Sequence, residues 1–261
     1  MGSSDEQSRL WGTRAKDYAE VQEGVFAALF LEVVEKILVR AEMTVLDIGC
    51  GSGIFCELAG RQGARVSGID ATDALLSIAR KRVPDGDFRV GEMEELPYSN
   101  QTFNVVTGIN SFQFAANPVN ALREASRVTR TGALVVIAVF GKREDADAAA
   151  YLAAVGSLLP PSPAGTPGPF ALSEDGALEA LVLKAGLIPI SVADVDCLWD
   201  YPDEKTALRG FLSSGPSIRA IQHAGADAVQ SAVLNSIAPF KTPSGGYQLR
   251  NKARYLIARN P

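Results

Sequence analysis

The stretch Val-Leu-Asp-Ile-Gly-Cys-Gly-Ser-Gly, residues Val45–Gly53, decides the fold, because an apolar run typical of a buried strand breaks there into a glycine loop that opens a helix. Glycines at 49, 51 and 53 let the backbone turn tightly and approach a ligand closely, since no Cβ is in the way. Asp70 ends the next apolar run, where an acid is positioned to accept hydrogen bonds from ribose hydroxyls. Together these features predict a site for a ligand that contains adenosine.

The identity of residue 54 narrows the class of ligand. The dinucleotide fingerprint requires a small residue there, and this chain has Ile54. A P-loop would continue into Gly-Lys-Ser/Thr, which does not follow. A nicotinamide-dependent oxidoreductase is therefore disfavoured. With Asp47 two residues before the first glycine, the segment instead resembles that of the class I S-adenosylmethionine-dependent methyltransferases, in particular those that act on small molecules.

Strand-like runs alternate with helical stretches along most of the chain, which predicts a parallel sheet covered by helices on both faces. Two further strand-like runs come late in the sequence. The count matches the fold of that family, an α/β, Rossmann-like, doubly wound sheet of seven strands, mostly parallel with an antiparallel last strand, plus a lid or insertion region. The expected strands are Thr44–Cys50, Arg65–Ala71, Asp87–Glu92, Phe103–Asn110, Ala133–Phe140, Ile188–Val195 and Tyr247–Ala258.

We expect one domain with four segments. These are an N-terminal helical lid (1–40), a cofactor-binding core (41–141), the remaining core elements with substrate-lid insertions (142–243) and the final strand (244–261).

The resemblance implies a set of residues that bind S-adenosylmethionine. Asp47, Gly49, Cys50 and Gly51 would surround the methionine half, with Cys50 as a small packing residue rather than a nucleophile. Asp70 and Ala71 would hold the ribose, Glu92, Met93 and Glu94 would border the adenine, and Asn110 would lie between cofactor and acceptor. For Glu92 and Glu94, a solvated turn is the alternative.

Trp11, Arg14 and Tyr18 share one helical face through their spacing of three and four residues. The resemblance implies a lid in which Arg14 pairs with the carboxylate of the cofactor and the aromatic rings cover the site. The alternative is an amphipathic helix that packs these rings on the sheet.

Residues for the acceptor are harder to choose. His223 is the only histidine and could act as a general base, although a lone histidine on a helix is more often a surface residue. The expected acceptor pocket is aromatic and apolar, with ordinary core packing as the alternative for each member: Phe112, Gln113, Phe170, Trp199 and Tyr201.

Composition restricts the setting of the protein. A net charge of −5 disfavours binding to nucleic acid or to an anionic membrane. The three cysteines form no C-x-x-C pair, no His/Cys metal-ligand cluster is present, and no apolar run approaches the length of a membrane span. We expect a cytoplasmic monomer or homodimer that transfers a methyl group from S-adenosylmethionine to an O, N or C atom of a small metabolite, without a metal. An RNA or protein methyltransferase and a non-catalytic protein that binds an adenosine ligand remain the alternatives.

Overall fold

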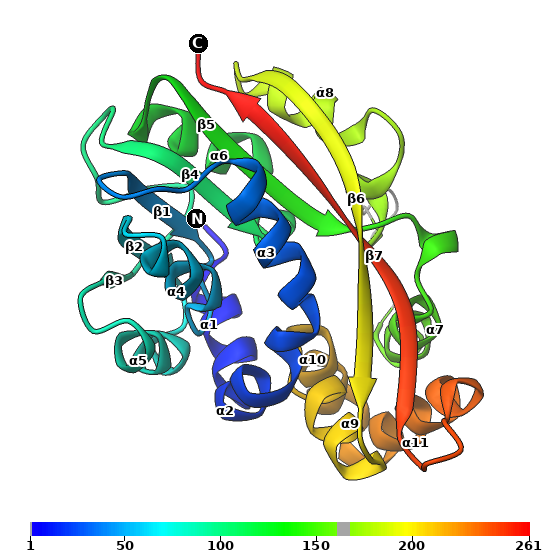
Figure 1. Ribbon diagram of the computed structural model, residues 1–261. Helices are drawn as coiled ribbons and strands as arrows, with labels where there is room; N and C mark the ends of the chain where they lie inside the picture. The colour runs from blue at the N-terminus through cyan, green and yellow to red at the C-terminus, as the bar shows by residue number, and fades with distance from the viewer. Residues whose placement is uncertain (1, 161–167) are drawn as a thin grey trace.

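The computed structural model of the protein describes residues 2–160 and 168–261. Within these residues seven strands form one sheet in the order β3-β2-β1-β4-β5-β7-β6. β1 to β5 pair in parallel, whereas β7 runs antiparallel to both of its neighbours (Figure 1). The predicted mixed sheet with an antiparallel last strand is confirmed. The strands are β1 (Thr44–Ile48), β2 (Arg65–Asp70), β3 (Asp87–Val90), β4 (Phe103–Ile109), β5 (Thr129–Phe140), β6 (Ile188–Tyr201) and β7 (Tyr247–Arg259).

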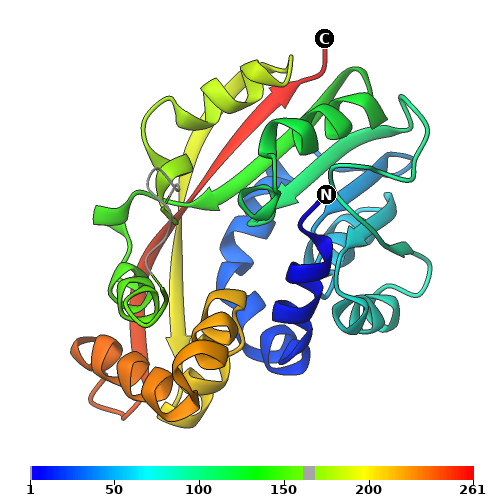
Figure 2. The same ribbon diagram turned by 180° about the vertical axis from the view of Figure 1, so that it is seen from behind.

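Helices cover both faces of the sheet, as Figures 1 and 2 show from opposite sides. Because successive side chains of a strand point to opposite faces, β1 contributes Val45 to one hydrophobic cluster and Leu46 and Ile48 to the other. The helices α3 (Ala27–Lys36), α4 (Ile54–Arg61) and α5 (Asp73–Arg82) pack on the first cluster, and α6 (Pro118–Val128) and α8 (Ala177–Lys184) pack on the second.

The chain that precedes α3, residues 2–26, is here called the N-terminal segment. It consists of α1 (Ser4–Gly12), α2 (Ala15–Asp17), a π-helical turn η1 (Tyr18–Gln22) and a 3₁₀ turn η2 (Glu23–Phe26). α1 lies beside α5 and α10 (Gly215–Ala224), whereas α3 packs against α4 and the edge strand β6. The stretch 1–40, expected as one helical lid, therefore includes α3, which covers the sheet.

The β6–β7 pair extends beyond the rest of the sheet. β5 pairs with β7 only from Ala253 to Arg259, so β6 is the one strand among the described residues that pairs with the first half of β7, out to the pair Tyr201–Tyr247. α7 (Ala148–Gly156), α9 (Glu204–Phe211), α10 and α11 (Ala226–Ile237) gather around this ribbon (Figures 1 and 2). β6 continues past Val195, the expected end, because buried Cys197, Trp199 and Tyr201 keep alternating with exposed residues.

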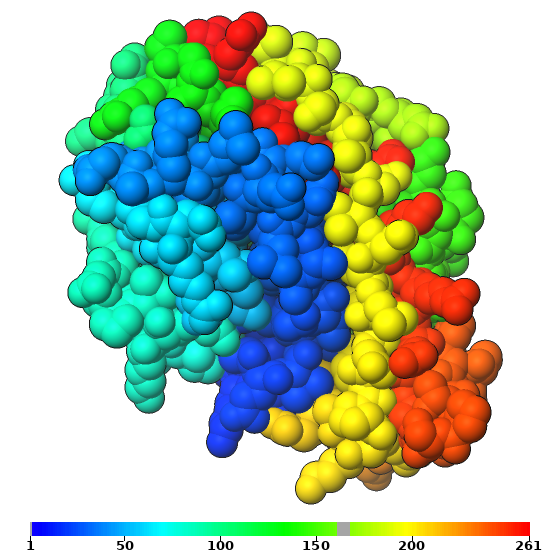
Figure 3. Space-filling view, in the orientation of Figure 1, coloured from blue at the N-terminus to red at the C-terminus, as the bar shows by residue number. Residues whose placement is uncertain are grey.

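Short 3₁₀ turns complete the chain: η3 (Phe112–Phe114), η4 (Arg143–Asp145), η5 (Ala171–Ser173) and η6 (Ala238–Phe240). The edge strand β6 lies on the surface next to α3 (Figure 3). Among the described residues, no helix has both the length and the apolar character that crossing a membrane requires.

Candidate active site

The glycine loop between β1 and α4 turns through left-handed backbone. Gly49 has a φ of +71° and Gly51 a φ of +54°, angles that residues other than glycine adopt only at a cost in free energy. A Cβ on Gly49 would lie 2.3 Å from the Cβ of Ser111. The loop thus packs against the residues that follow β4, and glycine is required at this contact.

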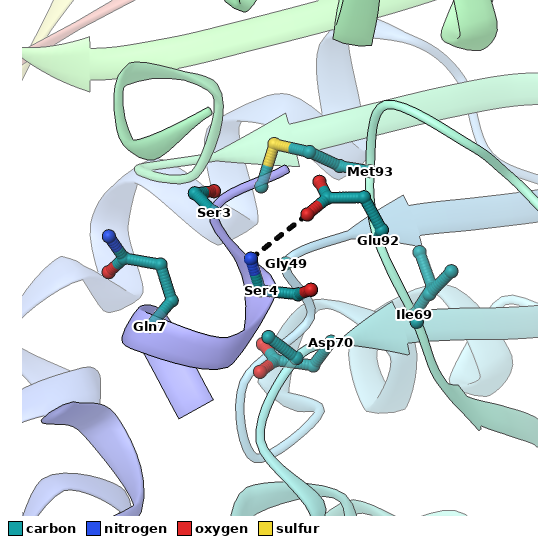
Figure 4. Close-up of a pocket in the computed structure, with 10 residues that line it drawn as sticks. Ser3, Ser4, Gln7, Gly49, Ile69, Asp70, Glu92 and Met93 are labelled. Carbon is teal, nitrogen blue, oxygen red and sulfur yellow. Dashed lines mark hydrogen bonds between the residues drawn. The ribbon is translucent and has the colours of Figure 1, made fainter. Parts of the chain in front are cut away.

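Asp70, at the end of β2, is fixed by two backbone N–H groups. The N–H of Gly51 donates to Oδ2 at 2.9 Å, and the N–H of Thr72 donates to Oδ1 at 2.8 Å. Burial raises the pKa of Asp70, and these two hydrogen bonds oppose that shift by stabilising the ionised form. The carboxylate is therefore held in one orientation beside the loop, at the wall of a cavity (Figure 4).

A second carboxylate lies against the same loop. The N–H of Ser52 donates to Oε1 of Glu23 at 2.9 Å, and the hydroxyl of Ser52 donates to the other oxygen of Glu23. The N–H groups at the start of a helix are those that bind phosphate in pyrophosphate sites. Here the N–H groups of Gly51 and Ser52 are bonded to carboxylates of the protein itself. This arrangement disfavours a pyrophosphate ligand, in agreement with the argument from Ile54.

A cavity with about 520 Å³ of empty space, part of it open to solvent, lies at the carboxyl ends of β1, β2 and β4. A smaller cavity of about 280 Å³ adjoins it beside Glu92 (Figure 4). The larger cavity is lined by Gln7, Trp11, Tyr18, Gly49, Gly51, Asp70, Ala71, Thr72, Leu75, Met93, Ile109, Asn110, Ser111 and Phe114.

Several polar atoms of this lining have no partner within the described residues. They are Oδ1 of Asn110, Oγ of Ser111 and Oγ1 of Thr72, all buried. Asn110 also has a φ of +53°, a strained conformation for a residue with a side chain. Buried polar atoms without partners are costly and uncommon, so they indicate a polar ligand here.

Aromatic side chains close one side of the cavity. Trp11 makes edge-to-face contacts with Tyr18 and Phe114, with ring centroids 5.2 and 5.5 Å apart. A Cβ on Gly215, in the first turn of α10, would lie 2.8 Å from Nε1 of Trp11. The ring of Trp11 is therefore held between the cavity and α10, and the aromatic residues form a wall of the site.

Asp47 lies behind the glycine loop. It is 3% exposed, and its Oδ1 accepts a hydrogen bond of 2.7 Å from the hydroxyl of Thr107. Burial raises the pKa of Asp47 to about 8, the bond from Thr107 lowers it, and the negative charges of Glu23 and Asp70 raise it further. The negative charges that act on Asp47 are those of Glu23 and Asp70, and they disfavour an anionic ligand beside the loop.

The structure brings most of the expected cofactor residues to the two cavities. The residues that line one or both are Trp11, Tyr18, Gly49, Gly51, Asp70, Ala71, Glu92, Met93 and Asn110. Oε2 of Glu92 accepts a hydrogen bond of 2.9 Å from the N–H of Ser4, so the N-terminal segment reaches the acid that we expected near adenine (Figure 4).

Four expected cofactor residues do not line either cavity. Asp47 and Cys50 are buried behind the loop, where a Cβ on Gly68 would lie 2.7 Å from the sulfur of Cys50. Arg14 precedes α2, and Glu94 accepts a hydrogen bond from the N–H of Asn117 before α6. These residues shape the surroundings of the site without facing it.

None of the five expected acceptor-pocket residues lines the two cavities. Phe112 is fully buried in the core beneath the sheet, Gln113 is half-buried, and Phe170 packs on Phe140. Trp199 and Tyr201 follow Val195, the expected end of the strand, but they lie in β6 and face the core, because the strand alternation continues through them.

His223 is exposed in the last turn of α10 and does not line either cavity. The imidazole is therefore separate from the residues that line the two cavities.

Sequence reasoning missed several residues of the site. Gln7 could have been found, because it lies four residues before Trp11 and its Oε1 accepts the indole N–H at 3.0 Å. Ser111 and Phe114 were not missed: the sequence placed Ser111 at the end of the fourth strand and Phe114 among the pocket aromatics, and both line the cavity with Asn110. Glu23 carries no local signal, since its partner Ser52 is far along the chain.

Residues 46–137 match the family model described as a methyltransferase domain. About a third of the chain, from β1 into β5, therefore matches a methyltransferase domain. The ubiquinone biosynthesis O-methyltransferase of Maricaulis maris is 32% identical over 43% of this chain and 46% of its own length. The demethylmenaquinone methyltransferase of Thermotoga maritima is 35% identical over 40% of this chain and 47% of its own length. The chain thus spans about half the length of these curated relatives.

Solved structures of this methyltransferase fold cover more of the chain. A SAM-dependent methyltransferase from Thermotoga maritima aligns with 98% of this chain and 100% of its own, with a TM-score of 0.58 and 15% identity. The [4+2]-cyclase SpnF aligns with 89% of this chain and 80% of its own, with a TM-score of 0.59 and 21% identity. At such identities the likeness concerns the fold alone.

Proposed function

We propose that this protein transfers a methyl group from S-adenosylmethionine to an O, N or C nucleophile of a small, neutral, apolar or aromatic metabolite. The observation that carries the proposal is the large cavity, where carboxylates surround a glycine loop whose N–H groups are bonded to them. A sulfonium nucleoside matches this environment, because its cation is attracted by the acids and its ribose offers hydroxyl donors to Asp70.

The residues would share the work of binding as follows. Asp70 would accept hydrogen bonds from the ribose, Met93 would contact the adenine, and Gly49 and Gly51 would allow the methionine half to approach the backbone. The orphan oxygens of Asn110 and Ser111 would receive donors of the cofactor or of the acceptor.

When bound, S-adenosylmethionine supplies a methyl group on a sulfonium, whose departure as a neutral sulfide requires no proton donor. The protein then has to hold the acceptor in line and exclude water. The aromatic wall of Trp11, Tyr18 and Phe114 suits this task, because it presents apolar surface and shields the cavity. A base is needed only for an acceptor that must lose its proton early.

The lining also bears on the class of acceptor. Among the described residues, the sides of both cavities contain acidic side chains and no Lys, Arg or His. This disfavours an anionic acceptor such as the carboxylate implied by the malonyl-[acyl-carrier protein] O-methyltransferase of Erwinia pyrifoliae, 24% identical over 78% of this chain and 74% of its own length. The two relatives named for ubiquinone and demethylmenaquinone support an apolar aromatic acceptor.

Isothermal titration calorimetry with S-adenosylmethionine tests the cofactor half of the proposal. We expect binding to the wild type and binding about tenfold weaker or more in Asp70→Asn, because one buried charged acceptor is lost. Asp73→Asn is the matched control, since Asp73 is a nearby acid whose side chain is 69% exposed and pairs with Arg80. No binding to the wild type, or equal binding by both variants, would refute the assignment.

Incubation with methyl-labelled S-adenosylmethionine and a panel of apolar aromatic, cationic and carboxylate acceptors tests the chemistry. We expect label in the apolar aromatic compounds, located by mass spectrometry and NMR. Tight cofactor binding without label in any small molecule would favour the non-catalytic alternative, and a reaction that rearranges the acceptor without methylation would point to a role like that of the cyclase SpnF.

A further inference from the structure

Glu23 is a buried acid that lies outside every motif of the glycine loop. It is 4% exposed and comes from η2 in the N-terminal segment. A buried carboxylate costs free energy unless it is well bonded, and this one is bonded to the glycine loop through both the N–H and the hydroxyl of Ser52. We propose that Glu23 is a positioning residue that fastens the N-terminal segment onto the glycine loop and so holds the aromatic wall in place over the cofactor.

Gln22, the preceding residue, makes a second anchor on the opposite side. It is 6% exposed, and its Oε1 accepts a hydrogen bond of 2.9 Å from the hydroxyl of Tyr201 in β6. Two consecutive side chains thus bond to different elements, the glycine loop and the edge strand. They fix the π-helical turn η1, a rare conformation that is frequent at functional sites.

The same turn carries part of the cavity wall. Tyr18, the first residue of η1, lines the cavity, and its Cε1 lies 3.7 Å from the position of a Cβ on Gly51. Oε1 of Glu23 lies 2.5 Å from that position, so loop, tyrosine and glutamate meet at one point. Because Tyr18 contacts Trp11, a shift of η1 would move both rings.

Arg82 completes the arrangement from the last turn of α5. Its Nη1 donates to the carbonyl oxygen of Ser52 at 2.8 Å and to the hydroxyl of Ser52 at 2.6 Å, and it lies 3.4 Å from Oε2 of Glu23. The guanidinium supplies the opposite charge that a buried carboxylate needs. Three elements that are separate in sequence, η2, the glycine loop and α5, are therefore joined at Ser52.

The positioning role rests on the proposed cofactor, and a purely structural role is the rival explanation. If Glu23 only stabilises the core, its replacement lowers the melting temperature while the folded protein binds S-adenosylmethionine as before. If Glu23 positions the N-terminal segment, its replacement weakens cofactor binding and loosens Trp11 in protein that is still folded. Acrylamide quenching of fluorescence reports on Trp11, because Trp199, the other tryptophan, is 1% exposed.

Glu23→Gln is the decisive variant, since it keeps the shape of the side chain and one acceptor oxygen for Ser52 but turns an amide NH₂ toward Arg82. We expect its dissociation constant for S-adenosylmethionine, measured by calorimetry, to rise about tenfold. We also expect stronger quenching of Trp11 in the free protein. Glu35→Gln, an exposed acid on α3, is the control and should match the wild type in both measurements.

Ser52→Ala is the second variant, because it removes only the hydroxyl partner and keeps the backbone N–H bond. For Ser52→Ala we expect a smaller rise in the dissociation constant and a smaller increase in the quenching of Trp11. This expectation holds also if Glu23→Gln does not fold. The proposal is overturned if a folded Glu23→Gln shows the affinity and the quenching of the wild type. If Glu23→Gln does not fold, the same result in Ser52→Ala overturns it. If the wild type itself does not bind S-adenosylmethionine, the proposed function fails, and the quenching comparison still decides whether Glu23 fastens the segment.

Discussion

Gly49→Ala tests the packing of the glycine loop against the end of β4. Two costs follow from the structure. An alanine at a φ of +71° adopts the left-handed region at a cost of about 1–2 kcal/mol. Its Cβ would also lie 2.3 Å from the Cβ of Ser111, which is attached to the backbone and cannot swing away, and such overpacking costs about 1–3 kcal/mol.

We therefore expect Gly49→Ala to lower the free energy of unfolding by about 2–5 kcal/mol, a large part of the roughly 5–15 kcal/mol of a typical domain. Urea denaturation followed by circular dichroism measures this loss. Gly186→Ala is the matched control, because Gly186 has a φ of +87° but nothing within 4 Å of its Cβ position. The control bears only the backbone cost, so the difference between the two variants isolates the contact with Ser111.

Cofactor binding should distinguish the same two variants. Gly49→Ala pushes the loop away from Ser111 and should abolish measurable binding of S-adenosylmethionine, while Gly186→Ala should bind like the wild type. Equal destabilisation by the two substitutions, or full binding by Gly49→Ala, would show that the loop adapts and that the close approach is not required.

Three further predictions concern charge and the choice of base. Burial raises the pKa of Asp47 to about 8, so between the pKa of the unfolded chain and pH 8 the native state holds an extra proton, and stability falls as pH rises. The melting temperature of Asp47→Asn should therefore rise relative to that of the wild type between about pH 5 and 9, and a difference that stays constant with pH would contradict this. His223→Ala should leave turnover unchanged at every pH, because the imidazole is exposed and lines neither cavity; a lost pH limb would restore it as a base. Arg254→Met removes a bidentate ion pair with the partly exposed Asp194 and should lower the free energy of unfolding, measured by urea denaturation, by about 1–3 kcal/mol. Cofactor affinity should stay unchanged, and a loss of affinity would reveal coupling to the site.

Much of the fold was predictable because its signals are local. Buried strands of the sheet read as short apolar runs, and the loop at residues 49–53 needs glycine for its positive φ angles, so neither depends on distant contacts. The end of β6 was mistaken although its signal was also local, since the alternation of buried and exposed residues runs through Trp199 to Tyr201. Trp199 and Tyr201 were assigned to the acceptor pocket because they are aromatic. The type of a side chain does not indicate which way it faces.

By itself, the sequence determined the sheet, its glycine loop and the acid at Asp70, because each depends on residues that are neighbours in the chain. Only the tertiary structure decided which side chains line the cavity, and that Glu23 accepts the hydrogen bond from the N–H of Ser52 just before α4. The bond from Ser52 to Glu23 spans 29 residues, and that from Tyr201 to Gln22 spans 179. Contacts over such separations leave no periodic pattern in the chain, since they arise only when packing of the sheet and helices brings distant segments together.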